Sequence, residues 1–121
     1  MHLDNIEQQA KANNYFRHVL ATGKHAQVVI MSIEAGGEIG EETHTDNDQV
    51  LYLVDGQGRV VLNGEEKPFN KGDLVLVLAG TRHNFVSDGS GPMKIITTYS
   101  PPHHPDATIH KTKAEADQAE H

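Results

Sequence analysis

The chain of 121 residues contains no cysteine, and this absence excludes several kinds of chemistry. Disulfide bonds, thiolate metal sites and thiol nucleophiles all require cysteine. A chain without cysteine fits a reducing compartment. The first residues also lack the basic start and apolar run of a secretory signal. We therefore expect a soluble protein of the cytoplasm.

Long apolar runs and basic charge are also scarce. No apolar stretch approaches the roughly 20 residues that are needed to span a bilayer. Seventeen acidic residues against ten basic ones give a formal net charge of -7. Such a surface repels phosphate backbones and anionic lipid. We therefore expect neither nucleic acid nor a membrane as a partner.

What the sequence does contain is a series of short β-patterned runs separated by turn residues. The runs cover residues 15–21, 27–33, 49–54, 58–62, 65–69, 74–78, 83–87 and 93–99. Asn63-Gly64 and Asp55-Gly56 are typical of tight turns between antiparallel strands. About eight such strands predict an all-β fold, a single jelly-roll or double-stranded β-barrel. The run 74–78 is almost continuously apolar, so we expect it to be covered on both faces.

The two ends of the chain have a different character. Asp4 to Asn14 predicts a short helix, with Asp4 as its cap and Glu7 in the capping-box position. We expect residues 1–25 to supply this helix and the first strand of the barrel domain, and residues 26–100 to form the barrel core. Residues 101–121 contain prolines that oppose strand pairing, and they predict an extended tail that packs over the barrel or a neighbour.

Two stretches carry the candidate chemistry. The first, Gly36 to Gly56, contains Glu42, His44 and Gln49, and the second, Gly72 to Ser87, contains His83. Residues two apart on a strand point to the same face, so Glu42 and His44 can converge on one ion. We expect Gln49 on the next strand and His83 on a strand across the barrel.

These stretches resemble the two half-motifs of the cupin superfamily, in particular its small single-domain members. The first half-motif has Gly, five residues, His-x-His, three or four residues, Glu, six residues and Gly. If His44 is the first histidine, Asp46 takes the second place and the following spacing fails. If His44 is the second histidine, Glu42 replaces the first, Gln49 replaces the glutamate, and every spacing fits. We adopt this second register, with Asp46 as the ligand under the other one.

The second half-motif has Gly, five residues, Pro-x-Gly, two residues, His, three residues and Asn. The chain matches it at Gly72, Gly80 and His83, with Leu78 for proline and Ser87 for asparagine. The resemblance covers about residues 27–99. It implies a β-barrel that holds one metal ion in its mouth, a small-molecule ligand or substrate, and a homodimer.

The ligand set implied by the resemblance is Glu42, His44, Gln49 and His83. Two imidazoles and one carboxylate suit Fe, Mn, Ni, Co or Zn, so we expect one divalent transition metal ion. Gln49 either binds the ion through its amide oxygen or hydrogen-bonds to a water or to His44. Arg82 is either a surface arginine or an anchor for an anionic substrate.

Three functions remain open at this point. The first is a metal-dependent enzyme of the dioxygenase, isomerase or lyase type that acts on a small organic molecule, with catalytic residues that the sequence does not identify. The second is a module that binds or senses a metal or a sugar-like ligand without turnover, which the replacement of glutamate by Gln49 favours. The third is a metal-free structural barrel. His103, His104 and His110 lie in the polar tail, where solvated histidine is the expectation.

Overall fold

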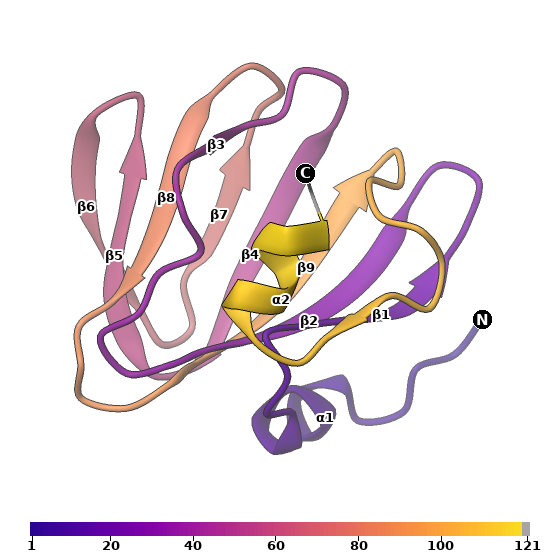
Figure 1. Cartoon of the computed structure of the whole chain (residues 1–121), viewed down its shortest axis with the longest axis horizontal. Coiled ribbons are helices and arrows are strands. Elements are labelled where there is room, and N and C mark those ends of the chain that lie inside the picture. Colours follow the sequence, from indigo (N-terminus) through magenta and orange to yellow (C-terminus); the bar gives the residue numbers. More distant parts are fainter. Residues whose placement is uncertain (120–121) are drawn as a thin grey trace.

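A computed structural model describes residues 1–119 of the chain, which fold into two antiparallel sheets and two short helices (Figure 1). The helices are α1 (Ile6–Ala12) and α2 (Lys113–Ala119). The strands are β1 (Arg17–Thr22), β2 (Gln27–Ile33), β3 (Glu42–Thr43), β4 (Asp48–Asp55), β5 (Gln57–Leu62), β6 (Glu65–Asn70), β7 (Leu74–Val77), β8 (Arg82–Ser87), β9 (Met93–Ser100) and β10 (Ile109–His110).

The two sheets face each other across one core, as the jelly-roll prediction requires. The larger sheet has the strand order β10-β1-β2-β9-β4-β7 and the smaller one the order β3-β8-β5-β6. Inward-facing side chains alternate with outward-facing ones, and Leu51, Phe85 and Ile95 are completely buried between the sheets. Burial of each such side chain contributes about 1.5–3 kcal/mol. The predicted all-β barrel is therefore confirmed.

Helix α1 covers part of the outer face of the larger sheet. Ala10 of the helix packs with Ile30 of β2 and Val54 of β4 in a second, smaller apolar cluster. Because the sheet core lies on one side of β2 and α1 on the other, adjacent residues Ile30 and Met31 are both buried. The predicted cap of α1 is wrong: its first flanking residue is Asn5, not Asp4, and Asn5 makes no capping hydrogen bond with its side chain.

The hairpin predicted at Asn63-Gly64 is confirmed. Both residues have positive φ angles, 50° and 83°, as a tight turn between twisted strands requires. Gly58, earlier on β5, meets another steric demand. A Cβ atom at this position would lie 2.0 Å from the carbonyl oxygen of Val86, so a side chain here would force the β5 and β8 strands apart.

Two expectations about packing differ from the structure. The run 74–78 was expected to be covered on both faces, but Leu74, Leu76 and Leu78 are 62%, 52% and 57% exposed. The physical reason is that β7 ends the larger sheet, so its outer face has no covering element in the described part of the chain. The tail, in turn, is more ordered than an extended segment: β10 pairs with β1, and Ala116 of α2 is 1% exposed within the main core cluster.

Neither helix is long or apolar enough to cross a membrane, since each has only seven residues.

Candidate metal centre

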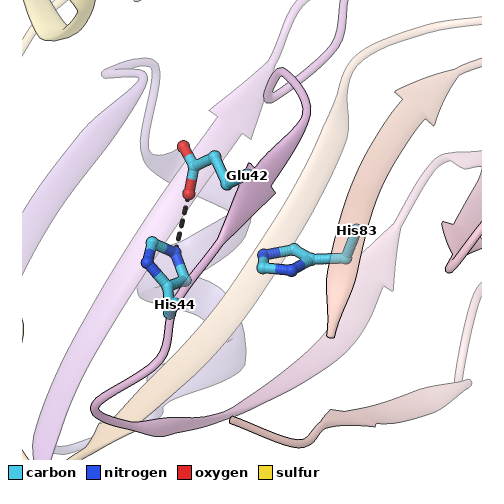
Figure 2. Close-up of side chains that lie close together, drawn as sticks. All are labelled: Glu42, His44 and His83. Carbon is cyan, nitrogen blue, oxygen red and sulfur yellow. Dashed lines mark ion pairs between the residues drawn. The ribbon is translucent and has the colours of Figure 1, made fainter. Parts of the chain in front are cut away.

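The pairing of β3 with β8 brings the two candidate motifs together. In this short antiparallel pair, Glu42 lies directly opposite His83. Directly opposite residues in a sheet project to the same face, with their Cβ atoms about 4.5–5.5 Å apart. His44 follows two residues after Glu42 and its side chain turns to the same side (Figure 2).

Glu42, His44 and His83 lie close enough to share one ion. One possible ligand atom from each residue falls within 4.8 Å of those from the other two, and they are the one such group of His, Asp and Glu side chains in residues 1–119. Nε2 of His44 is 2.7 Å from Oε2 of Glu42, and the His44 and His83 rings have centroids 5.2 Å apart. Figure 2 shows the His83 ring directed from its own strand toward the other two side chains.

The orientation of His83 is fixed by a main-chain contact. Its Nδ1 atom lies 2.8 Å from the carbonyl oxygen of Thr81. Since a carbonyl oxygen can only accept, Nδ1 carries the hydrogen and donates it. In the neutral ring, Nε2 then has a free lone pair for a metal ion, which is the arrangement that metal-binding histidines commonly have.

The local electrostatics keep both groups in the states that metal binding needs. Burial lowers the pKa of His83, although the Thr81 carbonyl and Glu42 oppose this effect. Burial alone would raise the pKa of Glu42, but the contact with His44 and the charges of Arg17 and His83 lower it overall. An ionised carboxylate and a neutral imidazole are therefore the favoured states at neutral pH.

Gln49 points into the barrel but is held by another side chain. It is 4% exposed, and its Nε2 atom donates a hydrogen bond to Oγ1 of Thr97 at 3.0 Å. Its Oε1 atom is buried and has no hydrogen-bond partner in the described part of the chain. Nε2 of His44 is also buried, and despite its short distance to Glu42 it makes no hydrogen bond of acceptable geometry among the described residues.

An unsatisfied buried polar atom is costly, so Oε1 of Gln49 fits a site that is completed by a metal ion or by water. A carboxylate and two imidazoles are also the right chemical types for a divalent transition metal. The residues present therefore fit such an ion.

Other charged residues named from the sequence lie outside this group. Asp46 is exposed on the loop after His44, and Oδ1 of Asp48 accepts a hydrogen bond from the main-chain N–H of Ala79. Arg82 forms an ion pair with Glu41 at 2.8 Å, with both side chains more than half exposed. This position favours the surface role for Arg82.

Two residues near the site were not predicted from the sequence. Arg17 on β1 is 2% exposed, and its charge helps to lower the pKa of Glu42. Strand alternation places Arg17 on the same inward face as Val19, and this signal could have identified it. His103 of the tail has its ring 4.4 Å from that of His44, measured between centroids. No local periodicity indicates this contact.

A small cavity opens beside His44. It has a volume of about 160 Å³ and is lined by Thr43, His44, Thr45, Asp46, Asn47 and His103. A larger depression of about 680 Å³ beside α1 is lined by none of the candidate ligands. Another cavity, of about 150 Å³, is lined by His83, so each of these two small cavities adjoins one residue of the ligand group.

The fold and the site geometry agree with a comparison against known families. The family model described as "Cupin domain" matches residues 29–99, which is more than half of the chain. The chain belongs to the cupin family. This cupin is 41% identical to the protein YrkC of Bacillus subtilis over 122 residues, an alignment that covers 96% of this chain and 66% of YrkC.

Solved structures give the same result. The crystal structure of BH2720 from Bacillus halodurans is similar with a TM-score of 0.95 and 38% identity, covering 97% of this cupin and 93% of that chain. KdgF from Halomonas sp. is similar with a TM-score of 0.67 and 25% identity, covering 72% of this cupin and 78% of that chain. This cupin thus resembles BH2720 over nearly its whole length, whereas YrkC extends beyond it.

Proposed function

We propose that this cupin binds one divalent transition metal ion through Glu42, His44, Gln49 and His83, and that it acts on a small organic molecule as a metal-dependent enzyme. The observation that carries this proposal is the grouping of Glu42, His44 and His83 ligand atoms within 4.8 Å. Fe, Mn, Ni, Co and Zn all suit these donors. The buried, unpartnered Oε1 atom of Gln49 supports its inclusion as the fourth donor.

Each residue has a distinct role in this proposal. His83 presents Nε2 because Thr81 holds its Nδ1 hydrogen, and Gln49 presents Oε1 because Thr97 holds its amide nitrogen. Glu42 supplies the single negative charge of the set. A bound divalent ion would supply Lewis acidity, which polarises a carbonyl group or orients an enediol or diketone. The reaction type would be that of a dioxygenase, isomerase or lyase.

A second candidate function is a cupin that binds or senses a metal or a sugar-like ligand without turnover. The amide of Gln49 favours it, since an amide oxygen is a weaker donor than the carboxylate that the cupin half-motif has at this place. A metal-free barrel is the third candidate, in which His44 and His83 make only local contacts such as that between His83 and Thr81.

Metal analysis of protein prepared without a histidine tag tests the metal proposal. We expect about one divalent ion per chain in the parent protein and in His25→Ala, whose residue lies in an exposed turn. We expect little or none in His83→Ala. Equal metal contents near zero in all three proteins would leave only the metal-free barrel.

Enzyme and binder are separated by assays on the Fe, Mn, Ni, Co and Zn forms. Oxygen uptake and isomerisation would be followed with a panel of diketones, acireductone-like compounds and sugars. Turnover that is lost in His83→Ala would support the enzyme. Saturable binding of one of these compounds without any turnover would support the binder.

We also propose that this cupin forms a homodimer through β7. Its exposed residues Leu74 and Leu76 stand opposite Tyr52 and Val50 of β4, so the outer edge of the larger sheet is apolar. Edge strands of monomeric proteins usually carry charges or irregularities that prevent pairing, and β7 has neither. A second copy of the chain that presents the same edge would cover both the exposed leucines and the unpaired edge of β7.

A further inference from the structure

The tail that follows β9 is attached to the barrel interior by one buried amide. Gln27 of β2 is 0% exposed, and its Nε2 atom donates to Oγ1 of Thr22 at 3.0 Å and to the carbonyl oxygen of His104 at 2.8 Å. Its Oε1 atom accepts from the main-chain N–H groups of His103 and His104, at 3.1 and 3.0 Å. All the hydrogen-bonding capacity of this amide is therefore used, mostly by the tail.

This attachment sets the position of the His103 ring. The ring stacks on that of Tyr99, with centroids 5.3 Å apart and planes 21° apart. Tyr99 itself is 2% exposed, so the stack rests on a rigid part of the core. The His103 ring also meets the His44 ring edge to face, and the centroids of these two rings are 4.4 Å apart. A tail residue thus stands beside a candidate metal ligand.

The ring of His103 forms part of a cavity wall rather than of the ligand group. It lines the cavity of about 160 Å³ together with His44, whereas its nitrogen atoms are not among the ligand atoms that lie within 4.8 Å of one another. The side chain is exposed, so it can meet a molecule that enters from solvent. A neutral imidazole offers one N–H donor and one acceptor nitrogen to such a molecule.

We propose that His103 is a ligand-binding residue of this site, which hydrogen-bonds from the tail to a small polar molecule held beside His44. A volume of 160 Å³ equals that of roughly five water molecules in the liquid, so the part of the molecule inside the cavity is small. Since this molecule would bind at the metal, the role of His103 depends on the metal binding proposed above.

Azide and Co(II) serve as probes, since azide coordinates divalent metals and accepts hydrogen bonds at its free end. The dissociation constants for Co(II), and then for azide on the Co(II)-loaded protein, would be measured by visible absorption for the full chain. The parent would be compared with His103→Ala, His103→Gln and the exposed-turn control His25→Ala. We expect His103→Ala to keep Co(II) affinity within about twofold and to bind azide about three- to tenfold more weakly, the value of one hydrogen bond. His103→Gln, which keeps an N–H donor, should recover part of the loss.

The possible failures are distinguishable. A parent protein that takes up no Co(II) overturns both the proposed function and the role of His103. A parent that binds Co(II) and azide, with unchanged azide affinity in His103→Ala, overturns the role of His103 alone. So does an equal loss in both His103 variants, which indicates packing, or a loss of Co(II) affinity as large as that in His83→Ala, which indicates direct metal ligation.

Discussion

Gln27 and His104 are joined by two hydrogen bonds that run in opposite directions. The amide nitrogen of Gln27 donates to the His104 carbonyl at 2.8 Å, and the His104 N–H donates to the amide oxygen at 3.0 Å. The side chain thereby acts like one residue of a neighbouring strand. These bonds hold the main chain of His103 and His104 against the barrel.

Gln27→Leu should weaken the attachment of the tail to the barrel. The change leaves the N–H groups of His103 and His104 and one carbonyl group without their partner, which we expect to lower the free energy of unfolding by about 2–4 kcal/mol. Urea unfolding would measure it. Gln27→Glu keeps the oxygen that accepts from the two N–H groups, but it sets a second oxygen against the His104 carbonyl and buries a charge, so it should also destabilise the protein. The exposed-site variant Gln57→Leu should change little, and an equal loss there would refute the explanation.

Removal of one metal ligand should reduce affinity in proportion to its donor strength. His83→Ala and His44→Ala should each weaken Co(II) binding at least about 100-fold, since outer partners of metal ligands alone are worth 10–100-fold. Glu42→Gln, which removes the charge but keeps the shape, should weaken it by about 10–100-fold. Competition with a chelator would measure these constants, and His25→Ala is the control. Parent-like affinity in His83→Ala would remove this residue from the site.

Gln49→Glu should make folding more dependent on metal. In the proposed ligand set the new, buried carboxylate would share the ion with Glu42, and without the ion desolvation and like-charge repulsion both oppose that arrangement. Without metal we expect the melting temperature to fall by about 5–10 °C. Added Co(II) should raise it by more than in the parent, because the ion neutralises the pair. Gln57→Glu, at an exposed position, is the matched control. An unchanged response to Co(II) would place position 49 away from the ion.

Acid should destabilise the protein through His104. Burial first, and then the nearby charges of Arg17, His103, His110 and His44, lower the pKa of His104 to about 3. The unfolded chain binds a proton near pH 6.5, whereas the folded chain does not until about pH 3. Above about pH 6.5 the low pKa of His104 therefore costs no stability. As the pH falls from 6.5 toward 3, the free energy of unfolding decreases progressively, because only the unfolded chain binds the proton.

His104→Phe should flatten this dependence, because the phenyl ring keeps the shape without titrating. The slope of unfolding free energy against pH should fall by up to about 1.4 kcal/mol per pH unit between pH 3 and 6.5. Urea unfolding at a series of pH values would show it. The main-chain bonds of His104 to Gln27 remain in this variant. A slope identical to that of the parent would contradict the assignment.

Leu76→Lys should abolish the proposed dimer. It places a charge in the middle of the exposed apolar edge, where a partner strand would have to bury it. Light scattering should change from twice the chain mass to the 13.3 kDa of one chain. Glu65→Lys, on the edge strand β6 of the other sheet, should leave the mass unchanged. A parent protein that is already monomeric would exclude the dimer.

The amino-acid sequence by itself determined most of the strands and their turns, but it placed His83 across the barrel from Glu42, whereas the two residues lie opposite each other on paired strands of one sheet. Alternation and turn residues act over a few neighbours, so the run 27–33 and the turn at Asn63-Gly64 could be predicted locally. The spacing that chose Glu42 over Asp46 is also local. In the structure the possible ligand atoms of Glu42, His44 and His83 lie close together and Asp46 is not in this group, while ligation of a metal by Glu42 stays a prediction.

Tertiary structure alone decided which strands lie at an edge and what the tail covers. The apolar pattern of Leu74 to Leu78 is the same for a central strand and for an edge strand, because only the strand order determines the neighbours. Likewise, nothing near Gln27 in sequence indicates that it binds main chain 76 residues away. Such contacts depend on where the closed barrel brings distant segments, and this is a property of the whole fold.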